Sequence, residues 1–147
     1  MIRSSKKPPR RSIPRCGSRG ANLILDTNAL SAFADEDPGI EKPLSEAEFL
    51  AIPVIALGEY RYGIAQSRHH EEYEAWLTGL LAECRVIEIT ETTTRFYAGL
   101  QNELREAGKP IPANDIWISA LCRQYKLPLL SKDHHFDFVR GIRRIEW

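Results

Sequence analysis

The chain has 147 residues, with 20 Lys and Arg against 20 Asp and Glu, which suffices for one domain with a real core and not comfortably for two. The zero formal charge hides an asymmetry, because residues 1–20 carry seven basic side chains and no acidic one. Residues 21–147 therefore hold 13 basic (20 minus 7) and 20 acidic side chains, a net charge of minus seven. An acidic body argues against a simple nucleic-acid-binding domain and suits a site that gathers carboxylates around divalent cations.

Cysteine usage and apolar segment length bear on the compartment. Cys16, Cys84 and Cys122 are odd in number, lack metal-ligand spacing, and two of them lie in apolar surroundings typical of reduced core cysteines. No apolar run approaches the length that crosses a bilayer, and the N-terminus lacks the apolar segment of a signal peptide. We therefore expect a soluble, cytoplasmic protein without a membrane partner.

Residues 1–20 are rich in Pro, Ser and like charges and poor in large apolar groups. Such a segment cannot bury enough surface to offset the entropy lost on ordering. We expect a disordered basic tail over residues 1–20 and one folded domain over residues 21–147.

The rest of the chain alternates short apolar runs with amphipathic segments. The expected strands are Leu23–Leu25, Phe49–Val54, Val86–Ile89, Leu127–Ser131 and Gly141–Trp147. Helices are expected from Ala29, at Leu44–Leu50, from Ile55, at His69–Glu83, along Phe96–Leu104 and at Ala113–Cys122, with loop chemistry at Asp35–Pro43. This alternation favours a three-layer α/β domain with a mainly parallel central sheet.

The stretch Leu23–Leu30 joins a strand to a helix. Three branched apolar residues predict a buried strand, and Asp26 follows at its carboxyl end, where ligands gather in parallel α/β sheets. In the alternative interpretation Asp26 merely caps the helix, since Asp, Thr and Asn accept hydrogen bonds from its first free N–H groups.

Three more acidic residues occupy comparable places. Asp133 follows an apolar strand, Asp115 opens the most apolar helix, and Glu59 lies in an apolar helix where an idle carboxylate is costly. Each has a structural alternative: a turn former for Asp133, an N-cap for Asp115, and for Glu59 a side chain that reaches water or pairs with Arg61 or Arg123.

Considered together, the four carboxylates can converge, because strand carboxyl ends and helix N-termini share one edge of a right-handed parallel sheet. Two like charges about 4 Å apart repel by roughly 4 kcal/mol at an effective dielectric near 20, so the cluster needs protons or cations. Oxygen-only ligation points to Mg²⁺ or Mn²⁺. Such ions would activate water and stabilise the leaving oxygen in phosphodiester hydrolysis.

Four segments carry these acids in a fixed order: Leu25–Leu30, Leu57–Glu59, Asn114–Ala120 and Leu130–Phe136. Their order and separation resemble the acidic motifs of the PIN-domain ribonucleases, and most of all the VapC-type toxins of bacterial toxin–antitoxin pairs. The resemblance covers Asn22–Trp147. Ser131 stands where Thr is commoner, a change that the shared hydroxyl should tolerate, and the basic tail is not part of the family pattern.

The resemblance implies an α/β/α PIN-like fold and a metal-dependent endoribonuclease. It implies a catalytic, metal-binding cluster of Asp26, Glu59, Asp115 and Asp133, supported by Thr27 or Asn28 and by Ser131. It also implies an RNA substrate, a cognate antitoxin and a homodimer. For an inhibitor helix of that antitoxin, the candidate groove lies between the helix Ile55–Ile64 and the segment Leu44–Leu50.

Two other hypotheses stand beside this one. An inactive PIN-like module would bind RNA or serve as a scaffold, although retention of all four carboxylates speaks against it. A phosphatase of the haloacid-dehalogenase type also places an Asp after its first strand, but it needs a second Asp two residues on, where this chain has Asn28. The paired histidines His69-His70 and His134-His135 point apart as neighbours, so we expect surface or supporting roles for them.

Overall fold

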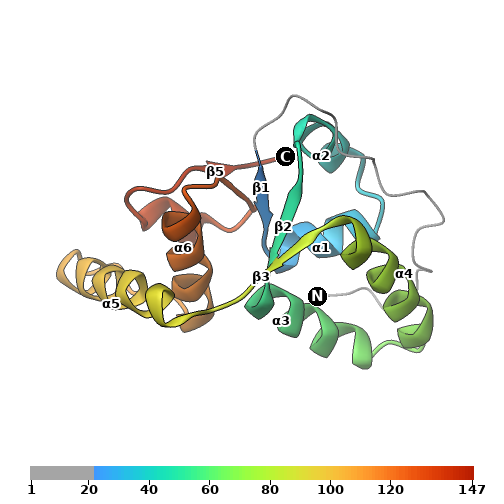
Figure 1. Cartoon of the computed structure of the whole chain (residues 1–147), viewed down its shortest axis with the longest axis horizontal. Helices are drawn as coiled ribbons and strands as arrows, with labels where there is room; N and C mark the ends of the chain where they lie inside the picture. Colours follow the sequence, from blue (N-terminus) through green and yellow to red (C-terminus); the bar gives the residue numbers. More distant parts are fainter. Residues whose placement is uncertain (1–21) are drawn as a thin grey trace.

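A five-stranded parallel sheet forms the centre of the molecule (Figure 1). The computed structural model describes residues 22–147, so the prediction for the tail at residues 1–20 lies outside the described residues. The strands lie in the order β3-β2-β1-β4-β5, and every neighbouring pair is parallel. They are β1 (Leu23–Leu25), β2 (Leu50–Pro53), β3 (Arg85–Ile87), β4 (Leu129–Leu130) and β5 (Arg144–Ile145).

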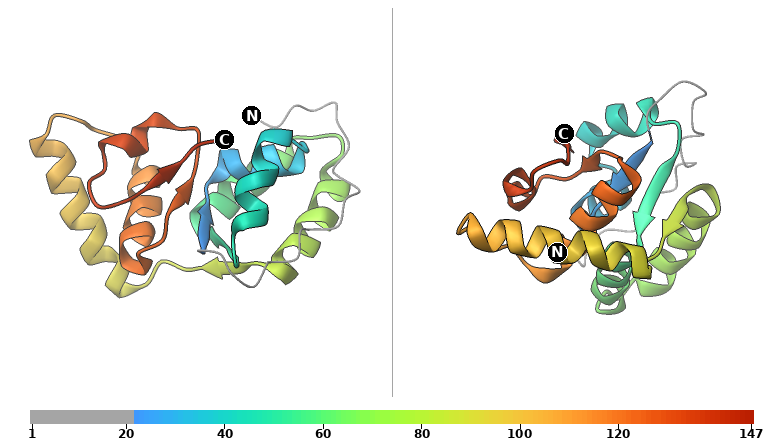
Figure 2. Two further views of the ribbon diagram at one scale, coloured as in Figure 1. Left: turned by 90° about the horizontal axis from the view of Figure 1, so that it is seen from above. Right: turned by 60° about the vertical axis from the view of Figure 1, so that its left-hand side comes forward.

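Six α-helices and two short 3₁₀ helices connect the strands. The α-helices are α1 (Thr27–Ala34), α2 (Glu41–Glu46), α3 (Val54–Ala65), α4 (His70–Glu83), α5 (Glu91–Glu106) and α6 (Ala113–Tyr125), and the 3₁₀ helices are η1 (Pro38–Ile40) and η2 (His134–Phe138). Helices α5 and α6 pack against each other on one side of the sheet, and α1, α3 and α4 lie on the other (Figures 1 and 2). The predicted three-layer α/β fold with a parallel sheet is confirmed.

The central strands are buried on both faces, as expected for a parallel sheet between two helical layers. Every residue of β1, β2 and β4 is buried, and these apolar runs interdigitate with α1, α3, α4 and the inner face of α6. A second apolar cluster joins α5 to α6, with Leu100, Leu104 and Ile116 at its centre. The rings of Tyr97 and Trp117 stack across the same helix pair, with 4.0 Å between centroids.

The order of the strands places the functional edge. The chain builds β1, β2 and β3 outward in one direction and then crosses back through α5 and α6 to lay β4 directly beside β1. A crevice opens at the carboxyl ends of neighbouring strands where the strand order reverses. Asp26 follows β1 and Ser131 follows β4, so both lie at this reversal.

Two details of the sequence prediction are wrong. The short helix expected at Leu44–Leu50 is α2, which begins at Glu41 and ends at Glu46, and the expected loop before it contains η1. The groove expected between this segment and α3 does not form, because β2 separates them and they lie at opposite ends of the sheet (Figure 1).

Candidate active site at the carboxyl edge of the sheet

Asp26 uses both carboxylate oxygens inside the protein. Oδ1 accepts a hydrogen bond of 2.9 Å from the Ala29 N–H and so caps α1. Oδ2 accepts a short hydrogen bond from the Ser131 hydroxyl. The capping alternative is therefore correct for Asp26. The same residue also lines the acidic cavity described below, so it both caps α1 and belongs to the cavity.

Ser131 ties the two halves of this edge together. Its hydroxyl donates to Asp26 and accepts a hydrogen bond of 2.9 Å from the Asp133 N–H. Asp133 in turn caps η2, because its Oδ1 accepts from the His135 N–H at 2.9 Å. The segment after β4 is thus locked against the end of β1 by side-chain hydrogen bonds.

Asp115 and Glu59 reach the same place from two helices. Asp115 lies in the first turn of α6, whose N-cap residue is Pro112, so the alternative in which Asp115 caps this helix does not hold. Glu59 lies on α3 beside Thr27 and Asn114, whose side chains act to lower the pKa of its carboxyl against the larger effect of burial. Glu59 is exposed and not in an apolar setting, which agrees with the alternative that its side chain reaches water. The alternative ion pairs do not form, because Arg61 pairs with Glu74 and Arg123 with Glu103.

These elements enclose one acidic cavity of about 230 Å³. It is lined by Asp26, Thr27, Asn28, Ser31, Glu59, Asp115, Ile118 and Asp133. The predicted convergence of the four carboxylates is therefore observed, across segments far apart in the sequence. The two expected supporting residues Thr27 and Asn28 have different neighbours. Thr27 lies beside Glu59, whereas Asn28 accepts a hydrogen bond from the Lys132 N–H and so holds the loop after β4.

The electrostatics of the cavity favour a bound cation. Burial raises the pKa of Asp26 to about 7, with smaller contributions from Asp115 and Asp133, while the bonds from Ser131 and Ala29 act in the opposite direction. Burial also raises the pKa values of Asp115 and Glu59, and in each case a neighbouring carboxylate adds to it. Carboxyls that are reluctant to ionise together are stabilised by a cation among them.

His135 contacts two carboxylates of the site, whereas the sequence pattern predicts only a surface or supporting role for it. Its Nδ1 lies 3.2 Å from Asp115 Oδ2 and 3.2 Å from Asp133 Oδ1. One ligand atom from each of these three residues lies within 4.8 Å of the other two. The sequence contains a signal for this position, because His135 lies two residues after Asp133. In the first turn of η2 the His135 ring comes to lie beside the Asp133 carboxylate that caps this turn.

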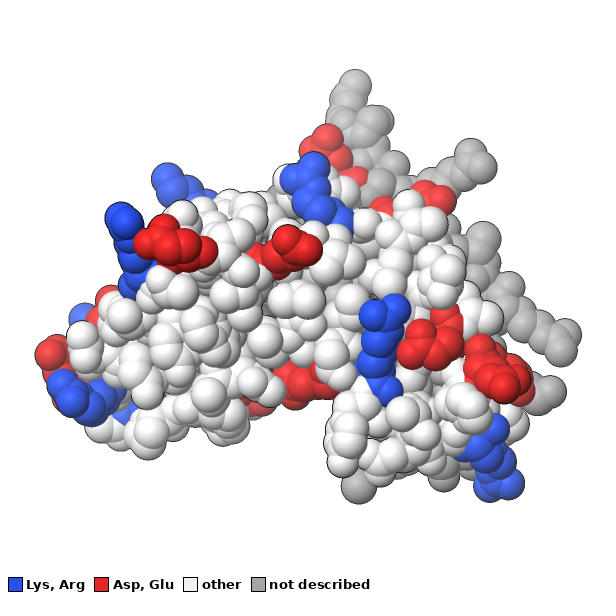
Figure 3. All heavy atoms as spheres, turned by 60° about the horizontal axis from the view of Figure 1, so that its bottom comes forward, with Lys and Arg blue, Asp and Glu red and all other residues white. Residues whose placement is uncertain are grey.

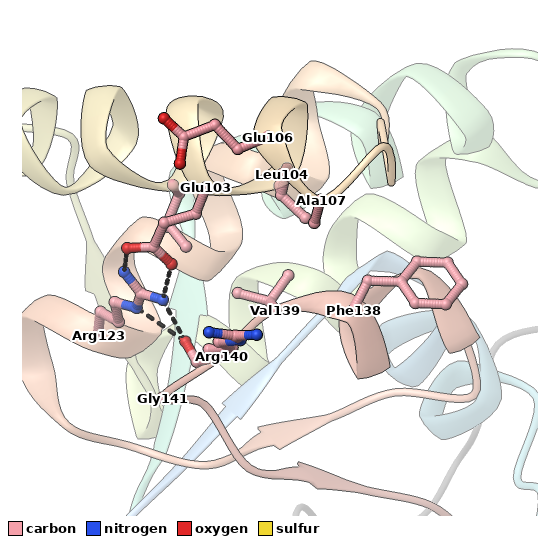
Figure 4. A pocket seen from close by; sticks show the side chains of 10 residues that line it. Glu103, Leu104, Glu106, Ala107, Arg123, Phe138, Val139, Arg140 and Gly141 are labelled. Carbon is pink, nitrogen blue, oxygen red and sulfur yellow. Dashed lines mark hydrogen bonds and ion pairs between the residues drawn. The ribbon is translucent and has the colours of Figure 1, made fainter.

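Two other features of the surface bear on where chemistry could take place. Figure 3, which turns the lower end of Figure 1 forward, shows Lys and Arg side chains scattered singly over that face among the described residues. A larger hollow of about 750 Å³ lies elsewhere, between α5, the end of α6 and the loop Phe138–Gly141. There Arg123 donates to both carboxylate oxygens of Glu103 and to the Arg140 carbonyl (Figure 4), so its main polar groups satisfy one another. The acidic cavity is the better candidate for chemistry.

Fold and cavity together define an α/β protein with a carboxylate site where β1 and β4 meet. The sequence matches the PIN domain family over residues 23–142, and the chain belongs to that family. It is 27% identical to Ribonuclease VapC5 of Mycobacterium tuberculosis over 128 residues, covering 84% of this chain and 91% of that protein. It is 29% identical to Ribonuclease VapC2 of Rickettsia felis over 101 residues, covering 66% and 75%.

Solved structures show the same fold. VapBC2 from Rickettsia felis, crystallised with a DNA fragment from its promoter, superposes with a TM-score of 0.77 at 23% sequence identity. The superposition covers 86% of this chain and 98% of the matched chain.

Proposed function

We propose that this protein is an endoribonuclease that hydrolyses RNA phosphodiester bonds and is the toxin of a toxin–antitoxin pair. The observation that carries the proposal is the convergence of Asp26, Glu59, Asp115 and Asp133 in one cavity at the reversal point of the sheet. The names of the curated relatives, which are ribonucleases, support the choice of RNA.

The cavity fits a divalent cation, Mg²⁺ or Mn²⁺, held by Asp115 and Asp133 with Asp26 and Glu59 beside them. The donor set is rich in carboxylate oxygen, which such ions prefer, and burial, with a smaller contribution from neighbouring carboxylates, raises the pKa values of Asp26, Asp115 and Glu59. When bound, the cation supplies Lewis acidity and lowers the pKa of a water nucleophile.

The chain's own residues position that chemistry. Ser131 holds the Asp26 carboxylate and the Asp133 backbone in one arrangement. Glu59 lines the cavity together with Thr27, where its carboxylate can accept a proton from an attacking water.

Asp115→Asn tests this function. The substitution removes a charge from the cavity and leaves the residue in the first turn of α6, so we expect a folded protein whose cleavage of RNA in Mg²⁺ or Mn²⁺ falls by about a hundredfold or more. Cleavage is measured on labelled RNA, with circular dichroism as the check on folding. Glu91→Gln, which removes an equal charge at the exposed start of α5, is the matched control.

An inactive RNA-binding or scaffold module is the competing function. It predicts that Asp115→Asn and wild type bind RNA equally and that neither cleaves it. Cleavage by the wild type that persists in excess EDTA, or cleavage at the wild-type rate by Asp115→Asn, would contradict the proposed metal-dependent nuclease activity.

We propose an antitoxin as the partner of this chain, together with a second copy in a homodimer, and the cytoplasm as its compartment. Similar solved structures include VapBC2 from Rickettsia felis and VapBC-5 from Mycobacterium tuberculosis, a member of the VapBC family of toxin–antitoxin systems. The acidic cavity is complementary to an Arg or Lys side chain, which would neutralise the same carboxylates as a cation. None of the helices in residues 22–147 is long and apolar enough to cross a membrane. Co-purification with the product of the adjacent gene tests the pairing.

A further inference from the structure

His135 stands where a cation ligand would stand. Its Nδ1 lies 3.2 Å from one oxygen of Asp115 and 3.2 Å from one oxygen of Asp133. Neighbouring ligands of an octahedral ion, each about 2.1 Å from it, lie about 3 Å apart. His135 Nδ1 is therefore spaced from each of the two carboxylate oxygens like an adjacent ligand of a single ion, and one ligand atom from each of the three residues lies within 4.8 Å of the other two.

The position of the ring is set by the fold. His135 lies in η2, and its backbone N–H donates to Asp133 Oδ1, so the histidine and the carboxylate share one short turn. Phe136, the next residue, is buried in the main core and anchors that turn. The His135 side chain is about half exposed (47%) and contacts two of the carboxylates that line the cavity, those of Asp115 and Asp133.

An imidazole ligand changes which ions a carboxylate site selects. Mg²⁺ takes oxygen ligands and keeps several waters, whereas first-row transition metals bind imidazole nitrogen well. We propose that His135 is a metal ligand through its imidazole nitrogen and that it gives this site a preference for Mn²⁺ and Co²⁺ over Mg²⁺. The inference rests on the proposed divalent-cation site and names its selectivity.

The test measures metal binding directly, without reference to RNA cleavage. Mn²⁺ and Mg²⁺ affinities are determined by calorimetry for wild type, His135→Asn and His134→Asn, and pulsed electron paramagnetic resonance of bound Mn²⁺ reports whether a nitrogen ligand is present. Asn at position 135 replaces the nitrogen ligand by an amide oxygen of similar reach. His134 is the matched control, because it is the adjacent histidine and its Nδ1 bonds Asp137, outside the cavity.

In wild type we expect Mn²⁺ to bind at least about tenfold more tightly than Mg²⁺, with a nitrogen coupling in the Mn²⁺ spectrum. His135→Asn should abolish the coupling and remove most of the preference, while Mg²⁺ affinity changes by less than about threefold. His134→Asn should match wild type.

Two outcomes overturn the inference, and a third separates its failure from that of the proposed function. Bound Mn²⁺ without nitrogen coupling would show that His135 is not a ligand. Tighter binding of both ions in His135→Asn would show that the ring only fills the place of the cation. If wild type binds neither ion, the cation site itself fails and the inference fails with it.

Discussion

Asp26 is a buried ionisable residue that also caps helix α1. The carboxyl is 3% exposed, and its pKa is about 7 in the folded state against 3.8 as the ordinary value. Between these two pH values the folded state holds a proton that the unfolded state has lost, so stability falls as pH rises through this window. The difference corresponds to at most about 4 kcal/mol, a cost that is complete above pH 7 and absent below about pH 4.

Asp26→Asn should therefore stabilise the metal-free protein at pH 8. Asn caps helices about as well as Asp and carries no charge, so we expect a gain on the order of 1–3 kcal/mol that disappears near pH 4. Denaturant unfolding in EDTA at the two pH values measures it. A variant less stable than wild type at pH 8 would show that the hydrogen bond to Ser131 outweighs the buried charge.

At the scale of single residues, the sequence predicted where each acidic side chain lies in the fold more accurately than it predicted which residues that side chain contacts. Asp26 and Asp133 were predictable because each follows a buried strand. The partners of Glu59 were not, since a helix periodicity does not say which neighbouring element its polar side faces. His135 was missed because residues 134–138 form a 3₁₀ turn, in which the spacing rules of strands and α-helices do not hold.

The ends of α5 and α6 determine where the second half of the site lies. Both helices close with the same hydrogen-bond pattern, in which an N–H beyond the helix reaches back five residues: Lys109 to the Leu104 carbonyl, and Leu127 to the Cys122 carbonyl. The turn needs one residue in the left-handed conformation, which is Gly108 (φ 64°) after α5 and Lys126 (φ 54°) after α6. The second turn directs the chain into β4 and so toward Ser131.

The two turns allow a reciprocal test of backbone strain. Lys126→Gly should raise the free energy of unfolding by about 0.5–1 kcal/mol, because glycine adopts the left-handed region without steric cost. Gly108→Ala should lower it by about 1 kcal/mol, and no atom within 4 Å of the added methyl group supplies another cause. Urea unfolding of both variants measures the effects. Changes of the same sign would contradict the assignment.

At the scale of elements, the alternation of apolar and amphipathic segments correctly predicted all five strands and the longer helices. The short elements were the weak point. Six-residue α2 and the turns η1 and η2 are shorter than two full periods of a hydrophobic pattern, so periodicity gives no boundary for them.

At the scale of the whole molecule, the topology divides the four carboxylates of the cavity between two segments of the chain. Asp26 and Glu59 come from the segment that builds β1, β2 and β3, and Asp115 and Asp133 come from the segment that crosses back to β4. The sequence predicted a parallel sheet and a shared edge from the alternation of elements. It did not predict that β4 would pair with β1, because strand order depends on which faces remain to be covered once the helices have packed.

This division has a consequence for the order of events during synthesis. Asp26 and its hydroxyl partner Ser131 are 105 positions apart, so a nascent chain can complete β1 to β3 and their helices long before the edge beside β1 is filled. Domains begin to fold from the N-terminal side during translation, and long-range parallel pairing is slow. In synchronised cell-free translation, RNA cleavage should consequently lag behind the appearance of full-length chain. There would then be an interval in which the full-length protein exists without RNA-cleaving activity, and a partner made at the same time could bind it before its site is complete.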